Sequence, residues 1–172
     1  KEDTPLHGVM VRCVRCFYQW LDPTLWEGSA LFELWEQELE LIYGDLRQRL
    51  SPNAKTDAGS LGNRFGFDAP PELPRLLQSI QTFYSVLIKL IAWNTLRGAT
   101  PEPPLTELLS GRAFVNQGIR NFCGDDWYIW PLDIWDPALE TQCEELRACL
   151  ESFDTCPEGS TLSPDSLSRI YE

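Results

Sequence analysis

The chain has 172 residues, of which 43% are hydrophobic and 12% aromatic. A chain of this length and composition can bury a core of its own, which excludes an intrinsically disordered protein. Its formal net charge of −12 excludes strong unaided binding to a phosphate backbone.

Two amphipathic helices are predicted in the first 50 residues. Thr4-Pro5 is typical of a helix start, and Ser51-Pro52 ends the second helix. The residues expected on the inner face of the first helix are Leu6, Met10, Cys13, Phe17 and Leu21. Those expected on the inner face of the second are Leu31, Leu34, Trp35, Leu39, Ile42, Leu46 and Leu50, with Glu33, Glu36 and Glu40 outside.

Residues 51–72 are rich in Gly, Pro, Asn and Asp, which predicts a long loop that is either functional or mobile. Its Phe-Gly-Phe could anchor on the core or form a contact loop. A third helix is predicted over residues 74–97, and it is apolar on nearly every side. Such a helix is usually central and buried all round. Lys89 is the exception, and we expect it to reach the surface or to pair with an acid.

The last third of the chain predicts further helices. TPEPPLTELLSG favours a short helical turn, Asp136-Pro137 begins a longer helix, and Ser163-Pro164 begins a last one that stops at Glu172. The stripe expected on the longer helix is Leu139, Cys143, Leu146, Leu150 and Phe153. We therefore predict one mainly α domain over 1–172, an irregular bundle of about five to seven helices around the central one, with at most one or two short strands.

The cysteines predict packing rather than chemistry. Cys13-x-x-Cys16 lies inside an amphipathic helix, no second such pair exists, and His7 is the only histidine. Zinc sites need four ligands, and redox pairs need an electropositive helix start. Six cysteines in a chain of this length do not form a disulfide framework, and KEDTPLHG is no signal peptide. The longest apolar run, FYSVLI, is too short for a bilayer, so we expect a cytoplasmic protein with no membrane span.

The segment GIRNFCGDDWYIWPLDIWDPAL, residues 118–139, combines acids with tryptophans. Residues 121–158 carry ten acids against one arginine, a net charge of −9, whereas residues 60–120 have a net charge of +2. The acids that could form a catalytic pair or a metal cage are Asp125, Asp126, Asp133 and Asp136. A capping role for Asp136 and a turn at Gly124-Asp125 are the favoured alternatives. For Trp127, Trp130 and Trp135, packing is favoured over a contact surface.

The order of these segments resembles the helical region that precedes the catalytic domain of large adenine-specific DNA methyltransferases of restriction–modification and phage-defence systems. The resemblance rests on GIRNFCGDDWYIWPLDIWDPAL, LESFD and LSPDSLSRIYE, with QTFYSVLIKLIAW as the central helix and LWEQELELIYGD as an earlier one. It covers most of residues 25–172. It implies a parent chain that uses S-adenosylmethionine, with a catalytic domain expected after residue 172, a neighbouring methyltransferase domain as partner, and DNA bound through the parent.

The family's glycine-rich methyl-donor loop and its Asn/Asp-Pro-Pro-Tyr motif are absent, so no catalytic, cofactor-binding or metal-binding residue is assigned. The leading hypothesis is a non-catalytic connector that braces the methyltransferase domain. The alternatives are a free-standing protein–protein adaptor and a small enzyme that uses the four aspartates. Candidate domain-interface residues are Trp127, Trp130, Trp135 and Tyr171; candidate DNA contacts are Arg64, Arg75, Arg97, Arg112 and Arg120.

Overall fold

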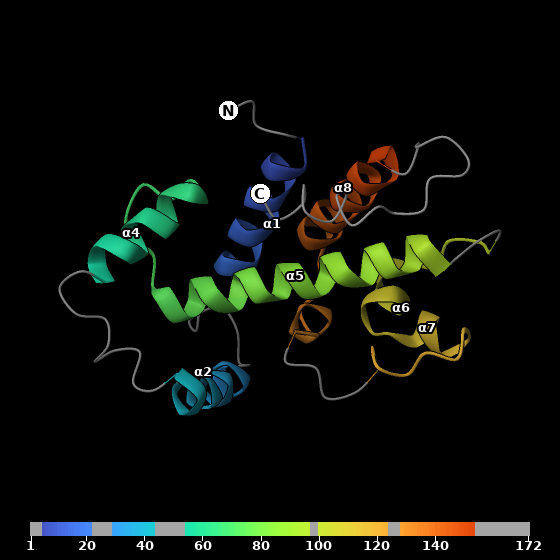
Figure 1. Cartoon of the computed structure of the whole chain (residues 1–172), viewed down its shortest axis with the longest axis horizontal. Helices are drawn as coiled ribbons and strands as arrows, with labels where there is room; N and C mark the ends of the chain where they lie inside the picture. Colours follow the sequence, from blue (N-terminus) through green and yellow to red (C-terminus); the bar gives the residue numbers. More distant parts are fainter. Residues whose placement is uncertain (1–4, 22–28, 44–53, 97–99, 124–127, 154–172) are drawn as a thin grey trace.

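The computed structural model describes residues 5–21, 29–43, 54–96, 100–123 and 128–153, and every regular element among them is helical (Figure 1). In chain order the elements are α1 (Pro5–Trp20), α2 (Ser29–Tyr43), α4 (Ala54–Arg64), α5 (Leu73–Leu96), α6 (Leu105–Leu109), α7 (Arg112–Val115), the 3-10 turn η1 (Trp130–Leu132) and α8 (Pro137–Phe153). This confirms the prediction of a mainly α bundle with one long apolar helix. The predicted helix at the C-terminal end lies outside the described residues.

The core forms where α1 and α8 pack against α5. Figure 1 shows α5 running across the molecule, with α1 and α8 on one side of it and α2, α6 and α7 on the other. The core side chains of α1 are Val9, Cys13, Val14 and Phe17, and those of α8 are Leu139, Cys143, Leu146 and Leu150. Both sets recur every three or four residues, which places each on one helix face. The inner face predicted for α8 matches the buried one from Leu139 to Leu150. For α1 the prediction holds at Cys13, Phe17 and Leu21, but Leu6 and Met10 are only partly buried, and Val9 and Val14, which were not predicted, are buried.

Within the predicted loop of residues 51–72, the structure contains the helix α4 over Ala54–Arg64, so that prediction was wrong for this part. The end of α4 is a Schellman motif: the Phe67 amide donates to the Gly62 carbonyl at 3.1 Å, and the Gly66 amide donates to the Asn63 carbonyl at 3.1 Å. Gly66 has a φ of 69°, as this motif requires. A Cβ on Gly62 would lie 2.4 Å from Cδ of Pro71, so glycine lets the helix approach that proline.

The segment after α4 is anchored on the last turn of α1. Phe65 is buried, and the Phe67 ring meets the Tyr18 ring edge-on at 4.8 Å. Arg75 donates from Nε to the Tyr18 carbonyl at 2.6 Å and from Nη2 to the Gln19 carbonyl at 3.3 Å. Its guanidinium also lies 4.1 Å from the centroid of the Tyr18 ring. Of the two alternatives for Phe-Gly-Phe, the structure favours anchoring.

Helix α2 packs through its Trp35 and Leu39 side chains, which are buried as predicted. Leu34 was predicted on the same inner face, and this was wrong, because Leu34 is 51% exposed. Leu41 is 80% exposed. Residues 34 and 41 are seven apart, so they share one face of α2. This face is not the one that carries Trp35, which contacts Gln81 of α5. The predicted continuation to residue 50 lies outside the described residues.

Lys89 is buried in the bundle and does not reach the surface, contrary to the first alternative considered for it. Its side chain is 3% exposed, and Nζ donates to the Leu109 carbonyl at 2.8 Å. That carbonyl ends α6, where the partial negative charge of a helix C-terminus favours a cation. The lysine therefore joins the central helix to α6.

Helix α5 is long and apolar enough to cross a membrane by length and hydropathy alone, although its longest uninterrupted apolar run is short. In the structure, however, 56% of its most apolar 18-residue window is buried by the rest of the chain. Buried polar side chains also interrupt it, at Gln78, Ser79, Thr82 and Lys89. These properties are typical of the core helix of a globular bundle.

Candidate functional site

Trp130 lies at the centre of the molecule and not on a surface. Its side chain is fully buried, and its indole N–H donates to Oγ1 of Thr82 at 2.9 Å. The Thr82 hydroxyl in turn donates to the Gln78 carbonyl one helical turn earlier, at 2.8 Å. Phe17 of α1 meets the indole ring edge-on, with centroids 5.9 Å apart. This burial confirms the packing interpretation for Trp130 and removes it from the residues that a neighbouring domain could touch.

The chain around Trp130 is fixed to α5 and α2 by a second polar link. The Tyr128 hydroxyl donates to Oε1 of Gln81 at 2.8 Å, and the indole N–H of Trp35 donates to the same oxygen at 3.2 Å. One glutamine thus joins three segments that lie far apart in the sequence. Trp135 is half-buried and packs against the same core. Trp127 and Tyr171, the other predicted interface residues, lie outside the described residues.

The described acids of this segment do not converge on a common point. One carboxylate oxygen of Asp136 accepts the Leu139 amide at 2.8 Å, which is the predicted cap of α8. Asp133 is exposed beside η1. Asp125 and Asp126 lie outside the described residues. Among the residues that the structure describes, no group of three or more His, Cys, Asp or Glu side chains is placed to hold a metal ion.

Two hollows on the described surface are shallow; one lies between α1 and α8, and the other lies along α8. One, of about 490 Å³, is lined by Arg12, Arg15, Cys16 and Gln19 of α1 and by Thr141 and Gln142 of α8, among others. The other, of about 530 Å³, lies along α8 over Glu140, Glu144 and Glu145. Both volumes fall within the range of ligand pockets, but both hollows lie wide open to solvent, so they offer a surface rather than an enclosed active-site cleft.

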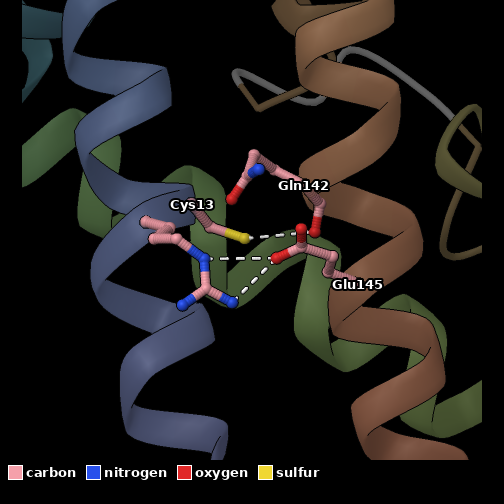
Figure 2. Close-up of polar contacts among 4 residues, drawn as sticks. Cys13, Gln142 and Glu145 are labelled. Carbon is pink, nitrogen blue, oxygen red and sulfur yellow. Dashed lines mark hydrogen bonds and ion pairs between the residues drawn. The ribbon is translucent and has the colours of Figure 1, made fainter.

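Figure 2 shows the polar contacts that join α1 to α8 beside this surface. Arg12 donates to one carboxylate oxygen of Glu145, from Nε at 3.2 Å and from Nη2 at 2.7 Å. Beside it, the Cys13 thiol donates to the Gln142 carbonyl at 3.5 Å. The ion pair is about half exposed, so it contributes little to stability. These contacts align the two helices rather than form a reactive centre.

Three thiols gather where α1 meets α8, and burial raises the pKa of each of them. Burial raises the pKa of Cys143 to about 12, with nearby Cys16 adding to the shift. Burial and then Asp136 raise the pKa of Cys16 to about 11, and burial raises the pKa of Cys13 well above its ordinary value. A reactive cysteine needs a lowered pKa. The environment of Cys13-x-x-Cys16 is therefore that of packing cysteines, as predicted.

The predicted DNA-contact arginines do not form one patch in the described structure. Arg75 is occupied by the carbonyls of Tyr18 and Gln19 at the end of α1. Arg64 is exposed at the end of α4. Arg112 and Arg120 are exposed in and after α7, where Nε of Arg112 donates to the Ser110 hydroxyl at 3.2 Å. Arg97 lies outside the described residues.

Sequence reasoning missed Gln81 and Thr82, the two acceptors that hold the tryptophans. The sequence signal for these two residues is a cluster of polar residues, Gln78-Ser79-Ile80-Gln81-Thr82, in the first half of a helix that is otherwise apolar. Polar side chains on a helix expected to be buried need hydrogen-bond partners, and tryptophans need acceptors.

When the chain is compared with protein-family models, with curated proteins and with solved structures, none of the three comparisons gives a match.

Proposed function

We propose that the chain is a non-catalytic helical scaffold, and that it serves as the connector beside the catalytic domain of an adenine-specific DNA methyltransferase of restriction–modification type. The observation that carries the scaffold part is the placement of Trp130: the residue at the heart of the acidic-aromatic segment is fully buried and bonded to Thr82. The methyltransferase part rests on the order of sequence segments that resemble that family. In this proposal the protein acts in the cytoplasm.

The geometry of the acidic-aromatic segment supports bracing better than catalysis. Its described side chains are used in core packing, in the link to Gln81 and in the cap of α8. A methyltransferase that extrudes a base from duplex DNA needs protein around its catalytic fold to hold the duplex in place. A rigid helical body can hold such parts in register, whereas the net charge of −9 over residues 121–158 makes this segment poorly suited to phosphate contact.

The gene that encodes the chain provides the direct test. We expect the same reading frame to encode a glycine-rich methyl-donor loop and an Asn/Asp-Pro-Pro-Tyr motif, with S-adenosylmethionine as the cofactor of that part. We also expect no S-adenosylmethionine binding by the 172-residue chain in calorimetry, and only weak, salt-sensitive DNA binding. A reading frame without these motifs would replace the methyltransferase proposal by the free-standing adaptor. Micromolar cofactor binding by this chain would contradict the non-catalytic role.

The rival in which the aspartates form a small active site has its own test. A metal-binding acid site would raise the melting temperature of the chain in Mg²⁺, Mn²⁺ or Zn²⁺, because a ligand that binds the folded state stabilises it. The double variant Asp125→Ala/Asp126→Ala would abolish that rise. We expect no rise in the unchanged protein; a rise that the double variant removes would favour the enzyme over the scaffold.

A further inference from the structure

Helix α2 presents two leucines to solvent on the side away from its packed face. The packed face carries Phe32, Trp35 and Leu39, and the rings of Phe32 and Trp35 stack 5.7 Å apart. On the other side, Leu34 is 51% exposed and Leu41 is 80% exposed. No other large hydrophobic side chain that the structure describes is as exposed as these two. Large apolar side chains that share one exposed face and are rimmed by polar residues are typical of a contact surface.

Glutamates flank these two leucines on both sides. At 3.6 residues per turn, Glu33 and Glu40 fall on one flank of the leucine stripe, and Glu38 falls on the other. The whole of α2 contains no Lys, Arg or His. Within the part of the chain that the structure describes, no cation forms an ion pair with these three glutamates. The outer face of α2 therefore combines two apolar anchors with negative charge that the chain itself does not neutralise.

The other exposed acidic and apolar surfaces lack this combination. On α8, Arg12 pairs with Glu145 at 2.7 Å, and Arg147 pairs with Glu144. Helix α5 was predicted to be buried all round, and this was wrong at Ile88, which is 47% exposed. No Asp or Glu lies within α5, so its exposed side does not indicate the charge of a partner. Of these three helices, α2 is the one whose surface specifies both an apolar and an electrostatic complement.

We propose that the outer face of α2, defined by Leu34, Leu41, Glu33, Glu38 and Glu40, binds an amphipathic helix that carries lysines or arginines beside its apolar residues. The two leucines are seven residues apart, about 10 Å along the axis, and a second helix presents apolar side chains at the same spacing. Charge complementarity selects cations for the flanks of that helix. The same carboxylates repel a second copy of α2, the phosphates of nucleic acid and an anionic membrane.

The length of the face sets the expected strength of the complex. Two helical turns form a small contact, which belongs to the weak and reversible class of interfaces. Burial of the two leucines supplies most of the affinity, whereas ion pairs at the rim contribute mainly to specificity and to the rate of association. A dissociation constant of about 10–500 µM is expected. The proposal does not depend on the methyltransferase role, because it uses only residues of α2.

Fluorescence anisotropy of a labelled model peptide, titrated with the 172-residue chain, tests this face. The probe is a stapled helix of about 15 residues, with leucines every three or four residues on one side and lysines beside them; the staple reduces the cost of ordering the peptide. One control peptide has the same composition with its leucines distributed around the helix. A second has glutamate in place of lysine. We expect binding of the first peptide only, and weaker binding as salt is added.

The apolar anchors are tested by the double variant Leu34→Ala/Leu41→Ala. Alanine keeps the helix, and loss of both anchors is expected to weaken binding of the probe at least about tenfold. Val115→Ala, at a site with 42% exposure on α7, is the matched control and is expected to change binding less than about twofold. If circular dichroism shows that the double variant has lost helix, Leu41→Ala alone is measured, because that side chain is 80% exposed.

The flanking charges are tested by Glu33→Gln/Glu38→Gln. At low salt this variant is expected to bind the probe at least about threefold more weakly than the unchanged chain. Glu107→Gln/Glu140→Gln removes two exposed carboxylates from α6 and α8 and is the matched control. Because it changes the net charge by the same amount, it separates the charge of the face from the charge of the whole chain.

Three results would overturn the proposal. The first is no binding of the probe up to about 1 mM chain at low salt. The second is equal binding of either control peptide, which would show that the leucine face or the charge of the partner does not matter. The third is an equal effect of a face variant and its matched control. The gene sequence decides the connector role separately, so either proposal can fail alone.

Discussion

Thr82 is the residue on which the packing of the acidic-aromatic segment depends most directly. Its hydroxyl accepts the Trp130 N–H and donates to the Gln78 carbonyl, all within the core. Thr82→Val keeps the shape but removes the acceptor, and the loss of a buried hydrogen bond costs about 1–3 kcal/mol. We expect urea unfolding to show a decrease of this size. Thr82→Ser retains the hydroxyl and is expected to lose less; equal losses would show that the bond to Trp130 is not what matters.

Gly111 has a left-handed backbone conformation and lies against the Phe122 backbone, with no room for a side chain. Its φ is 80°, and a Cβ there would lie 2.0 Å from the Phe122 carbonyl oxygen. Gly118 has nearly the same φ, 79°, with open space around the added Cβ. Gly118→Ala is therefore expected to cost about 1–2 kcal/mol, the cost of the left-handed conformation alone.

Gly111→Ala adds a backbone clash and is expected to cost more than about 3 kcal/mol. Thermal unfolding of the two variants measures the difference. If both lose the same stability, the close approach of the Phe122 backbone to α7 would be the wrong explanation.

At the scale of the element, helix α8 depends on its cap. The Asp136 carboxylate accepts the Leu139 amide, one of the amides that a helix start leaves without an internal partner. Asp136→Ala is expected to lower the unfolding free energy by about 1 kcal/mol, a typical cost for a lost cap. Asp133→Ala, three residues earlier and exposed, is expected to change it by less than about 0.5 kcal/mol. A larger loss at Asp133 than at Asp136 would contradict the assignment of the cap.

Helices whose apolar residues recur regularly could be predicted from the sequence, and those held by distant contacts could not. The stripes of α1 and α8 have a strong period and each helix begins at a proline, so most of their buried positions were predicted, although Val9 and Val14 were missed. Helix α4 contains Gly59 and Gly62, which are poor helix formers in isolation. Gly62 of this helix packs against Pro71, and no local sequence pattern predicts that contact.

The same limit applies to the candidate site. A buried role for Trp130 follows from its residue type, but its acceptor lies 48 residues away in the sequence. The carbonyl that receives Lys89 lies 20 residues away. Pairings at such separations are set by how α5 crosses its neighbours, and single-sequence patterns carry no information on that crossing.

At the scale of the whole molecule, the buried thiols make stability depend on pH in the alkaline range. The pKa of Cys143 rises from 9.0 to about 12 on folding, mainly because of burial. The unfolded chain thus loses this proton at a lower pH than the folded one. Stability from this group is fully present below pH 9 and is lost as pH rises toward 12, at up to about 1.4 kcal/mol per pH unit.

Urea unfolding at pH values from about 8 to 10.5 measures this effect. The comparison is with Cys143→Ala, which lacks the thiol and is expected to lose less stability over the same interval. Its lower starting stability does not affect the comparison, because the slope with pH is what is measured. Identical slopes in the two proteins would show that Cys143 ionises alike in the folded and unfolded chains.

Because Lys89 is buried, chemical modification of its amine would report the separation of α5 from α6. The chain has three lysines, Lys1, Lys55 and Lys89, and the amine of Lys89 is enclosed against the end of α6. An amine-acylating reagent can modify it only while α5 and α6 are apart. The rate at which Lys89 is acylated, measured by mass spectrometry, would therefore report how often the two helices separate. An acylation rate proportional to reagent concentration would show that the helices close again faster than the reagent reacts.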